Sequence, residues 1–91
     1  MSAKAALRLG QIVTTPNVLR RIASDDILSA LQRHQAGDWG DVKDDDRKAN
    51  DRALIEGERI LSVHHSVIGI KIWIMTERDR SVTTILLPED Y

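Results

Sequence analysis

The chain has no cysteine and no phenylalanine, and only two tryptophans and one tyrosine among its 91 residues. The absence of cysteine excludes disulfides, thiolate zinc sites and cysteine nucleophiles. Three aromatic residues are too few for a platform on which nucleic-acid bases stack, although each tryptophan could stack one base. Composition alone therefore removes several classes of function.

Neither sign of charge prevails, because 13 basic and 14 acidic residues leave a formal net charge of -1. Duplex-binding domains usually carry a basic excess, so the net charge does not indicate a nucleic-acid partner, although it leaves room for a local basic patch. No apolar run approaches the roughly 20 residues that span a bilayer, and no signal-peptide pattern opens the chain. We expect a cytoplasmic protein that makes no contact with membranes.

The chain is 42% hydrophobic and 30% charged, which is typical of a folded domain. Its length predicts a single domain over residues 1–91. A domain of this size has a thin core, so a partner or a second copy would add stability.

Helix signals occupy the first two-thirds of the chain. Thr15-Pro16 is an N-cap followed by a first helical residue, and it predicts a short helix over 16–23. Ser24 predicts the cap of a second helix that ends near Gln35. A third helix is expected over 44–56, with acidic residues at its start and Gly57 at its end.

From residue 59 onward the hydrophobic period changes to two, which predicts strands over 59–66, 70–76 and 81–87. Residues 11–14 predict a short edge strand near the N-terminus. Short turns between the later strands favour an antiparallel meander. We expect an α+β fold in which two or three N-terminal helices pack on one face of a three- to four-stranded antiparallel sheet.

The middle strand places Ile70, Ile72 and Ile74 on one face, which we interpret as the core face, joined by Leu61 and Val63. The opposite face then carries Lys71, Trp73 and Met75, with His64 nearby. Tryptophan beside methionine is typical of a contact surface, and a homodimer is one use of it. Alternatively, the N-terminal segment or the tail at 88–91 covers this face.

A second candidate contact surface comprises His34, Asp38, Trp39 and Asp41. The alternative is that Trp39 fills the core while the two aspartates cap turns and helix starts. The acids around residues 38–46 do not match a calcium loop, because Ala49 stands where that loop needs glycine. Adjacent strand histidines point to opposite faces, so we expect no metal site and no cofactor.

Catalysis is an alternative interpretation. His34 or His64 with Glu77 and Arg80 would suit a small metal-independent RNA-cleaving enzyme, in which Glu or His acts as base and Arg stabilises phosphorane charge. A further alternative is an accessory protein that binds nucleic acid without cleaving it. That alternative requires a contiguous basic patch from Arg8, Arg20, Arg21, Lys71, Arg78 and Arg80.

Two motifs in the sequence are similar to those of a known family: HQAGDWGD at 34–41 and TERDRSVTTILLPEDY at 76–91. With the residues between them, they make the chain resemble a family of short bacterial proteins, labelled plasmid-related or hypothetical, from plasmids and integrated mobile elements. The resemblance implies a mobile-element setting, and it carries over no catalytic residue. His64-His65 departs from the tyrosine-containing strand expected at that place.

The prediction is therefore a protein-interaction module without enzymatic activity, which binds a protein partner or a second copy of itself. Modulation of host defence or of element transfer is one version of that role. The residues expected at its contact surfaces are Lys71, Trp73, Met75, His34, Asp38, Trp39 and Asp41.

Overall fold

The computed structural model describes residues 6–91, so part of the expected N-terminal segment lies outside the described residues. The elements follow the order β1 (Gln11–Thr14), α1 (Pro16–Arg21), α2 (Ser24–Gln35), α3 (Asp44–Glu56), β2 (Ile60–His65), β3 (Lys71–Thr76) and β4 (Val82–Leu86). A short 3-10 helix, η1 (Pro88–Asp90), follows β4. The predicted α+β class is confirmed.

The sheet has the strand order β1-β4-β3-β2. Strands β2, β3 and β4 form the predicted antiparallel meander, with Val63 opposite Trp73 and Trp73 opposite Leu86. Strand β1 pairs with β4 in parallel, so the sheet is mixed rather than purely antiparallel. The reason is connectivity, because α1, α2 and α3 lie between β1 and the meander and allow a parallel return.

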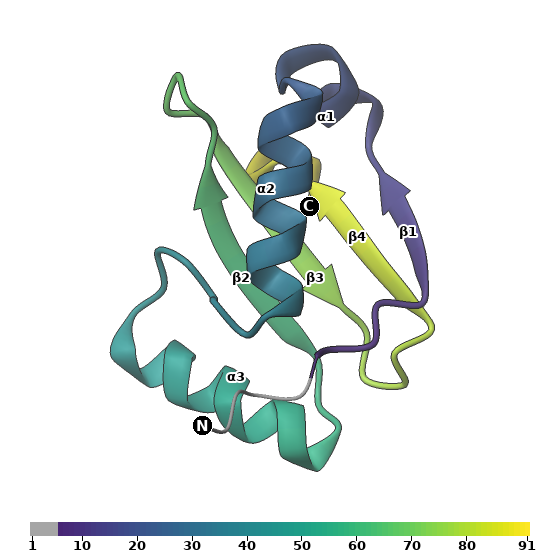
Figure 1. Cartoon of the computed structure of the whole chain (residues 1–91), viewed down its shortest axis with the longest axis vertical. Coiled ribbons are helices and arrows are strands. Elements are labelled where there is room, and N and C mark those ends of the chain that lie inside the picture. Colours follow the sequence, from purple (N-terminus) through teal and green to yellow (C-terminus); the bar gives the residue numbers. More distant parts are fainter. Residues whose placement is uncertain (1–5) are drawn as a thin grey trace.

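Helix α2 crosses one face of the sheet, α1 sits at one end of it, and α3 lies at the other end (Figure 1). The main core forms between α2 and the sheet and contains Val18, Ile22, Ala30, Ile72, Ile74, Ile85 and Leu87. A second core beneath α3 contains Leu7, Trp39, Ala53 and Ile60. Within residues 6–91, no helix is both long and apolar enough to cross a membrane.

Local signals explain most helix ends. The side chain of Thr15 accepts a hydrogen bond from the backbone nitrogen of Val18, and Gly57 ends α3 with a φ of 77°. The predicted cap at Ser24 is wrong, because Ala23 occupies the cap position without a side-chain bond. The positive end of α2 is instead complemented by two acids in its first turn, Asp25 and Asp26.

The predicted core face of β2 is also wrong. Leu61 and Val63 pair with Met75 and Trp73, so they lie on the face opposite α2. Ile60, Ser62 and His64 face the core instead, and His64 is therefore buried rather than beside Trp73. Ile72 and Ile74 lie on the core face as predicted.

Candidate functional site

The side chain of His34 reaches from α2 into the sheet and is fully buried. Its Nδ1 lies 2.6 Å from Oγ of Ser62, and its Nε2 lies 2.8 Å from Oγ1 of Thr76. The Thr76 hydroxyl lies 2.7 Å from that of Thr83, while Nε2 of His64 lies 3.0 Å from Oγ of Ser62. Two histidines and three hydroxyl groups thus form one buried chain of hydrogen bonds.

The direction of this chain follows from its last bond. Thr83 donates its hydroxyl hydrogen to the carbonyl oxygen of Leu9 at 2.8 Å. Each hydroxyl group has one hydrogen to donate, so Thr76 must donate to Thr83 and accept from Nε2 of His34. The lowered pKa values of His34 and His64 keep both rings neutral. Nδ1 of a neutral His34 then accepts from Ser62, whose oxygen accepts from Nε2 of His64, so each ring carries its proton on Nε2.

Nδ1 of His64 lies at the end of this chain; it is buried and has no hydrogen-bond partner among residues 6–91. Burial lowers the pKa of His34 to about 3, and repulsion from positive charge on His64 and Arg80 contributes to this lowering. Burial likewise lowers the pKa of His64 to about 4; Arg33 adds to this effect and Asp38 opposes it. A histidine held neutral in this way gains nothing from the negative end of the helix dipole.

The other two candidate catalytic residues point elsewhere. Arg80 donates to the backbone oxygens of Ala53, Glu58 and Glu77 at 2.7 to 3.2 Å, and so ties the end of α3 to the residue that follows β3. Glu77 lies 3.3 Å from Arg59. His34 and His64 are buried, so these four side chains do not line a common cleft among the described residues.

The segment from Asp38 to Asp41 closes the outer edge of β2. Trp39 is buried, as its alternative interpretation predicted, and its Nε1 donates to Asp51 at 2.9 Å. Val63 donates its backbone hydrogen to the carbonyl of Trp39 and accepts from the amide of Asp41 at 2.7 Å. Gly40 has a φ of 72°, and a Cβ there would lie 2.0 Å from the carbonyl oxygen of Val63.

Two aspartates of this segment stay exposed. Asp38 pairs with Arg33 at 2.8 Å, and this bond, with the amide of Gly40, lowers the pKa of Asp38. Asp41 lies 3.9 Å from His65. Of the second predicted contact surface, only these two acids can therefore reach a partner, since His34 and Trp39 are buried.

The sheet face opposite α2 is the open face, which we define by its central residues Leu61, Val63, Trp73, Met75 and Thr84. All of them are partly exposed. As expected for the tail, η1 lies against β3, and the ring of Tyr91 lies 5.9 Å from that of Trp73. Asp90 anchors this turn by accepting bonds from Thr15 and Asn17. The tail therefore packs over part of the open face at Trp73 and leaves Leu61 and Val63 partly exposed.

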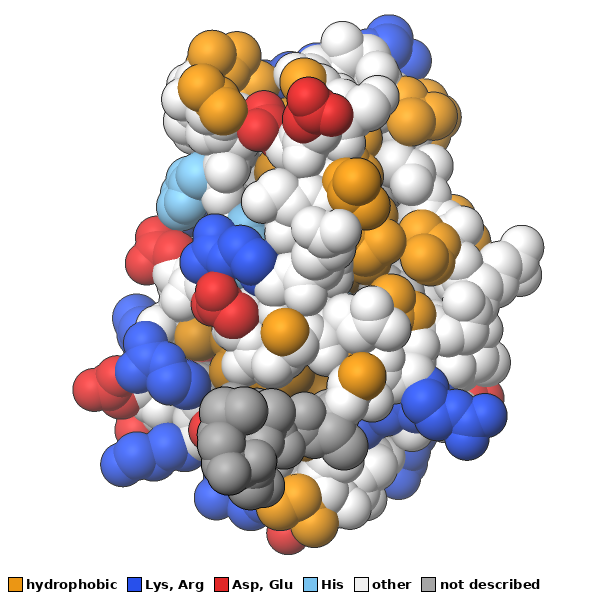
Figure 2. All heavy atoms as spheres, in the orientation of Figure 1, with side chains coloured by type: hydrophobic (Ala, Val, Ile, Leu, Met, Phe, Trp, Pro, Cys, Tyr) orange, Lys and Arg blue, Asp and Glu red, His pale blue; other side chains and the backbone are white. Residues whose placement is uncertain are grey.

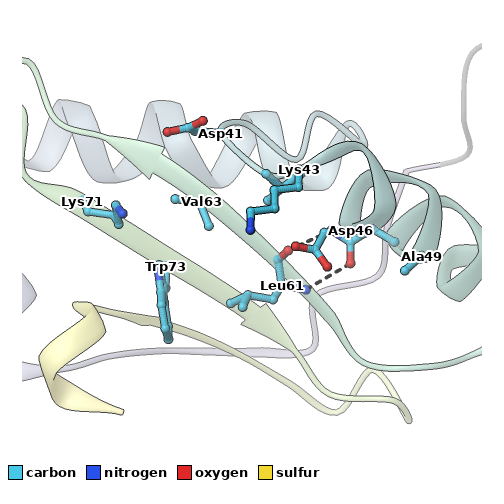
Figure 3. Close-up of a pocket in the computed structure, with 10 residues that line it drawn as sticks. Asp41, Lys43, Asp46, Ala49, Leu61, Val63, Lys71 and Trp73 are labelled. Atoms are coloured by element: carbon cyan, nitrogen blue, oxygen red, sulfur yellow. Dashed lines mark hydrogen bonds between the residues drawn. The ribbon is translucent and has the colours of Figure 1, made fainter.

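A groove of about 460 Å³ runs along the open face beside α3. Leu61, Val63 and Trp73 form its apolar wall on the sheet. Figure 3 shows Lys43 and Asp46 extending toward this wall from the side of α3, with Lys71 farther along β3. The groove thus combines an apolar surface with charges of both signs. The sequence predicted Trp73 and Lys71 here but missed Leu61 and Val63, which it assigned to the core.

Comparisons with known proteins add no identification. No protein-family model matches the chain, and no curated protein or solved structure is significantly similar to it. The geometry of the chain itself must therefore carry the functional argument.

The basic residues required for a nucleic-acid patch are spread over the molecule. Arg20 and Arg21 lie on α1, whereas Arg78 and Arg80 lie in the β3–β4 turn at the opposite end (Figure 1). Several of them already have partners, since Arg21 pairs with Glu89 at 2.8 Å and Arg78 lies 3.8 Å from Glu58. Within residues 6–91, no cluster of three or more histidines and acids is placed to hold a metal ion.

Proposed function

We propose that this chain is a protein-interaction module without enzymatic activity, and that it binds a partner protein through the groove on its open face. The carrying observation is that Trp73 and Met75, with Leu61 and Val63, stay partly exposed on a sheet face that α1, α2 and α3 leave uncovered. Large apolar side chains gathered on an accessible face are the composition of a binding surface.

The groove favours a particular partner chemistry. Its apolar wall suits an aliphatic or aromatic side chain, and burying such a side chain contributes about 1.5–3 kcal/mol. Lys43 and Lys71 stand near Asp41 and Asp46, so the rim has no net sign. The partner segment should therefore present one large apolar residue flanked by both acidic and basic residues, rather than a nucleic-acid backbone, which needs a basic surface.

The resemblance to short proteins of plasmids and integrated elements supplies the setting of this proposal. In that setting the module belongs to a bacterial mobile element, and its partner is a protein of host defence or of element transfer. The RNA-cleaving alternative has less support, because His34 and His64 are buried within hydrogen bonds instead of facing solvent.

Met75→Glu tests the proposal, since it places a charge on the open face directly opposite Leu61, which lines the groove. Ile55→Glu is the matched control, because Ile55 is 86% exposed on α3 and is not among the residues of the groove. Proteins retained from a bacterial lysate by the wild type should be retained by the control and lost by Met75→Glu. A protein retained in this pattern should then bind purified wild type and change the fluorescence of Trp73 in a Trp39→Phe background.

Two results would overturn the proposal. One is equal retention of every captured protein by wild type and Met75→Glu, with circular dichroism showing both folded. The other is a purified partner that binds without altering Trp73 fluorescence and without protecting Leu61 and Val63 from hydrogen exchange.

A further inference from the structure

The two edges of the sheet are not equivalent. At β2, the edge is closed, because Val63 bonds to Trp39 and Asp41 while the side chain of Asn50 bonds to both backbone groups of Leu61. At β1, no strand of residues 6–91 lies beyond the edge. An edge strand with free backbone groups is a template for pairing with another strand.

The backbone of β1 directs specific groups outward. The amide of Gln11 donates to Ser81 at 3.0 Å and that of Thr15 donates to Ile85 at 3.1 Å, so odd-numbered residues bond to β4. Groups of alternate residues point to opposite sides of a strand, and Ile12 and Thr14 therefore direct their N–H and C=O groups away from the sheet.

The surface beside this edge is apolar and uncharged. Ile12 and Val13 are 46% and 41% exposed, and β1 itself contains no charged residue. On α2, Leu28, Leu31, Gln32 and Gln35 share one side at helical spacing, and Gln35 on that side bonds to Leu7, just before β1. Figure 2 shows hydrophobic side chains along the strip between α2 and β1.

Three residues of α2 carry charge: Asp25 and Asp26 in its first turn, which line a hollow with Val67, and Arg33. Asp26 accepts from the amide of Val67, which follows β2, and Arg33 pairs with Asp38. This asymmetry matters because a two-fold axis brings identical groups together, so a self-contact cannot tolerate clustered charge of one sign. The β1 side of the molecule meets that requirement.

We propose that two copies of this chain pair through β1, antiparallel about a two-fold axis at Val13. In this register Ile12 of one copy lies opposite Thr14 of the other, and the two residues exchange both backbone hydrogen bonds. The symmetry gives four such bonds, places Val13 against Val13 on the open face, and brings the Leu28 sides of the two α2 helices together. The proposal does not rest on the proposed function, because it uses the opposite edge of the sheet from the groove.

The solution mass, from light scattering on a size-exclusion column, tests the pairing. The wild type should be a dimer, whereas Ile12→Lys and Ile12→Glu should each be folded monomers, because the two positions are diagonal neighbours about 7–8 Å apart across the axis. An equimolar mixture of the two variants should recover the dimer mass, which unfolding of either variant could not produce. Met75→Glu should leave the dimer intact, so that failure here and failure of the groove are distinguishable.

Hydrogen exchange supplies a second measurement on the unmodified chain. The amides of Ile12 and Thr14 should become more protected as protein concentration rises, while that of Arg8 should not change. A wild-type monomer at the highest attainable concentration would overturn the pairing. A dimer that persists in both Ile12 variants would also overturn the pairing, because it would use another surface. The pairing would likewise be overturned if the β1 edge paired only with peptides of a different protein.

Discussion

His34 on α2 and Ser62 on β2 are joined by a 2.6 Å hydrogen bond between Nδ1 and Oγ, although both residues are fully buried. The bond joins the helix layer to the sheet through a buried polar contact. Because Ser62 also accepts from His64, its hydroxyl group links the two imidazoles. Protonation of either ring would remove an acceptor or create a buried charge, so the packing of α2 on the sheet is sensitive to acid.

We expect the free energy of unfolding to fall as the pH drops below about 6.5. In the unfolded chain both rings titrate near the ordinary histidine pKa of 6.5, whereas in the fold those pKa values are about 3 and about 4. The unfolded state therefore binds more protons across this window, and stability is lost as the pH falls. Each ring should cost about 1.4 kcal/mol per pH unit below 6.5.

Denaturant titrations at pH 7.5 and pH 5 measure this loss. His64→Asn should roughly halve the pH dependence, while His65→Gln removes an exposed histidine outside the buried chain and should preserve it. Asp38 and Asp90, whose pKa values are lowered below 3.8, contribute only at more acidic pH. Equal stability at the two pH values would contradict the prediction.

The close approach at Gly40 gives a second prediction. In Gly40→Ala, the new Cβ would lie 2.0 Å from the backbone oxygen of Val63. Relieving this clash requires the backbone itself to shift, which costs more free energy than moving a flexible side chain. Gly57→Ala is the matched control, because its φ of 77° is nearly the same and no atom lies within 4 Å. The free energy of unfolding of the control should fall only by about 1–2 kcal/mol, which is the cost of a left-handed backbone conformation for a residue with a Cβ.

Thermal and chemical unfolding should rank Gly40→Ala well below Gly57→Ala. Amide exchange at Val63 and Asp41 should also increase in Gly40→Ala, because the bonds that close the β2 edge separate. If the two alanine variants were equally stable, the contact between Gly40 and Val63 would not be the constraint.

Two arginines of the β3–β4 turn should differ sharply. Arg80→Ala removes three bonds from a charged donor to backbone oxygens, and a hydrogen bond to a charged group contributes about 1.5–3 kcal/mol. Arg78→Ala removes a solvent-exposed pair with Glu58, worth about 0–1 kcal/mol. Urea unfolding of both variants against wild type checks the ranking, and equal stability of the two variants would contradict it.

Local chemistry made much of this fold predictable. Thr15-Pro16 and Gly57 marked helix ends, and alternation marked each strand to within one or two residues. The edge strand at 11–14 was predicted with the correct bounds. Its parallel partner was not, since pairing depends on how three intervening helices cross the sheet rather than on the four residues themselves.

The site was harder to predict because hydrophobicity and register disagreed in β2. Leu61 and Val63 are more apolar than Ser62 and His64, yet the polar pair faces the core. Hydrogen bonds to His34 and within the buried chain offset the cost of burying these groups. One signal was present in the sequence: Thr76 continues the isoleucine face of β3, which marks that end of the core as polar.

Asn50 helps to close the outer edge of β2, and no sequence motif predicted this role. Its side-chain amide bonds to both backbone groups of Leu61, and Val63 bonds to Trp39 and Asp41, so the outward backbone groups of Leu61 and Val63 are closed to an incoming strand. A sheet that is sealed on one side can grow in one direction only. Once two β1 edges have met, both outer borders of the joined sheet are sealed strands, and the assembly ends there instead of polymerising into a fibre.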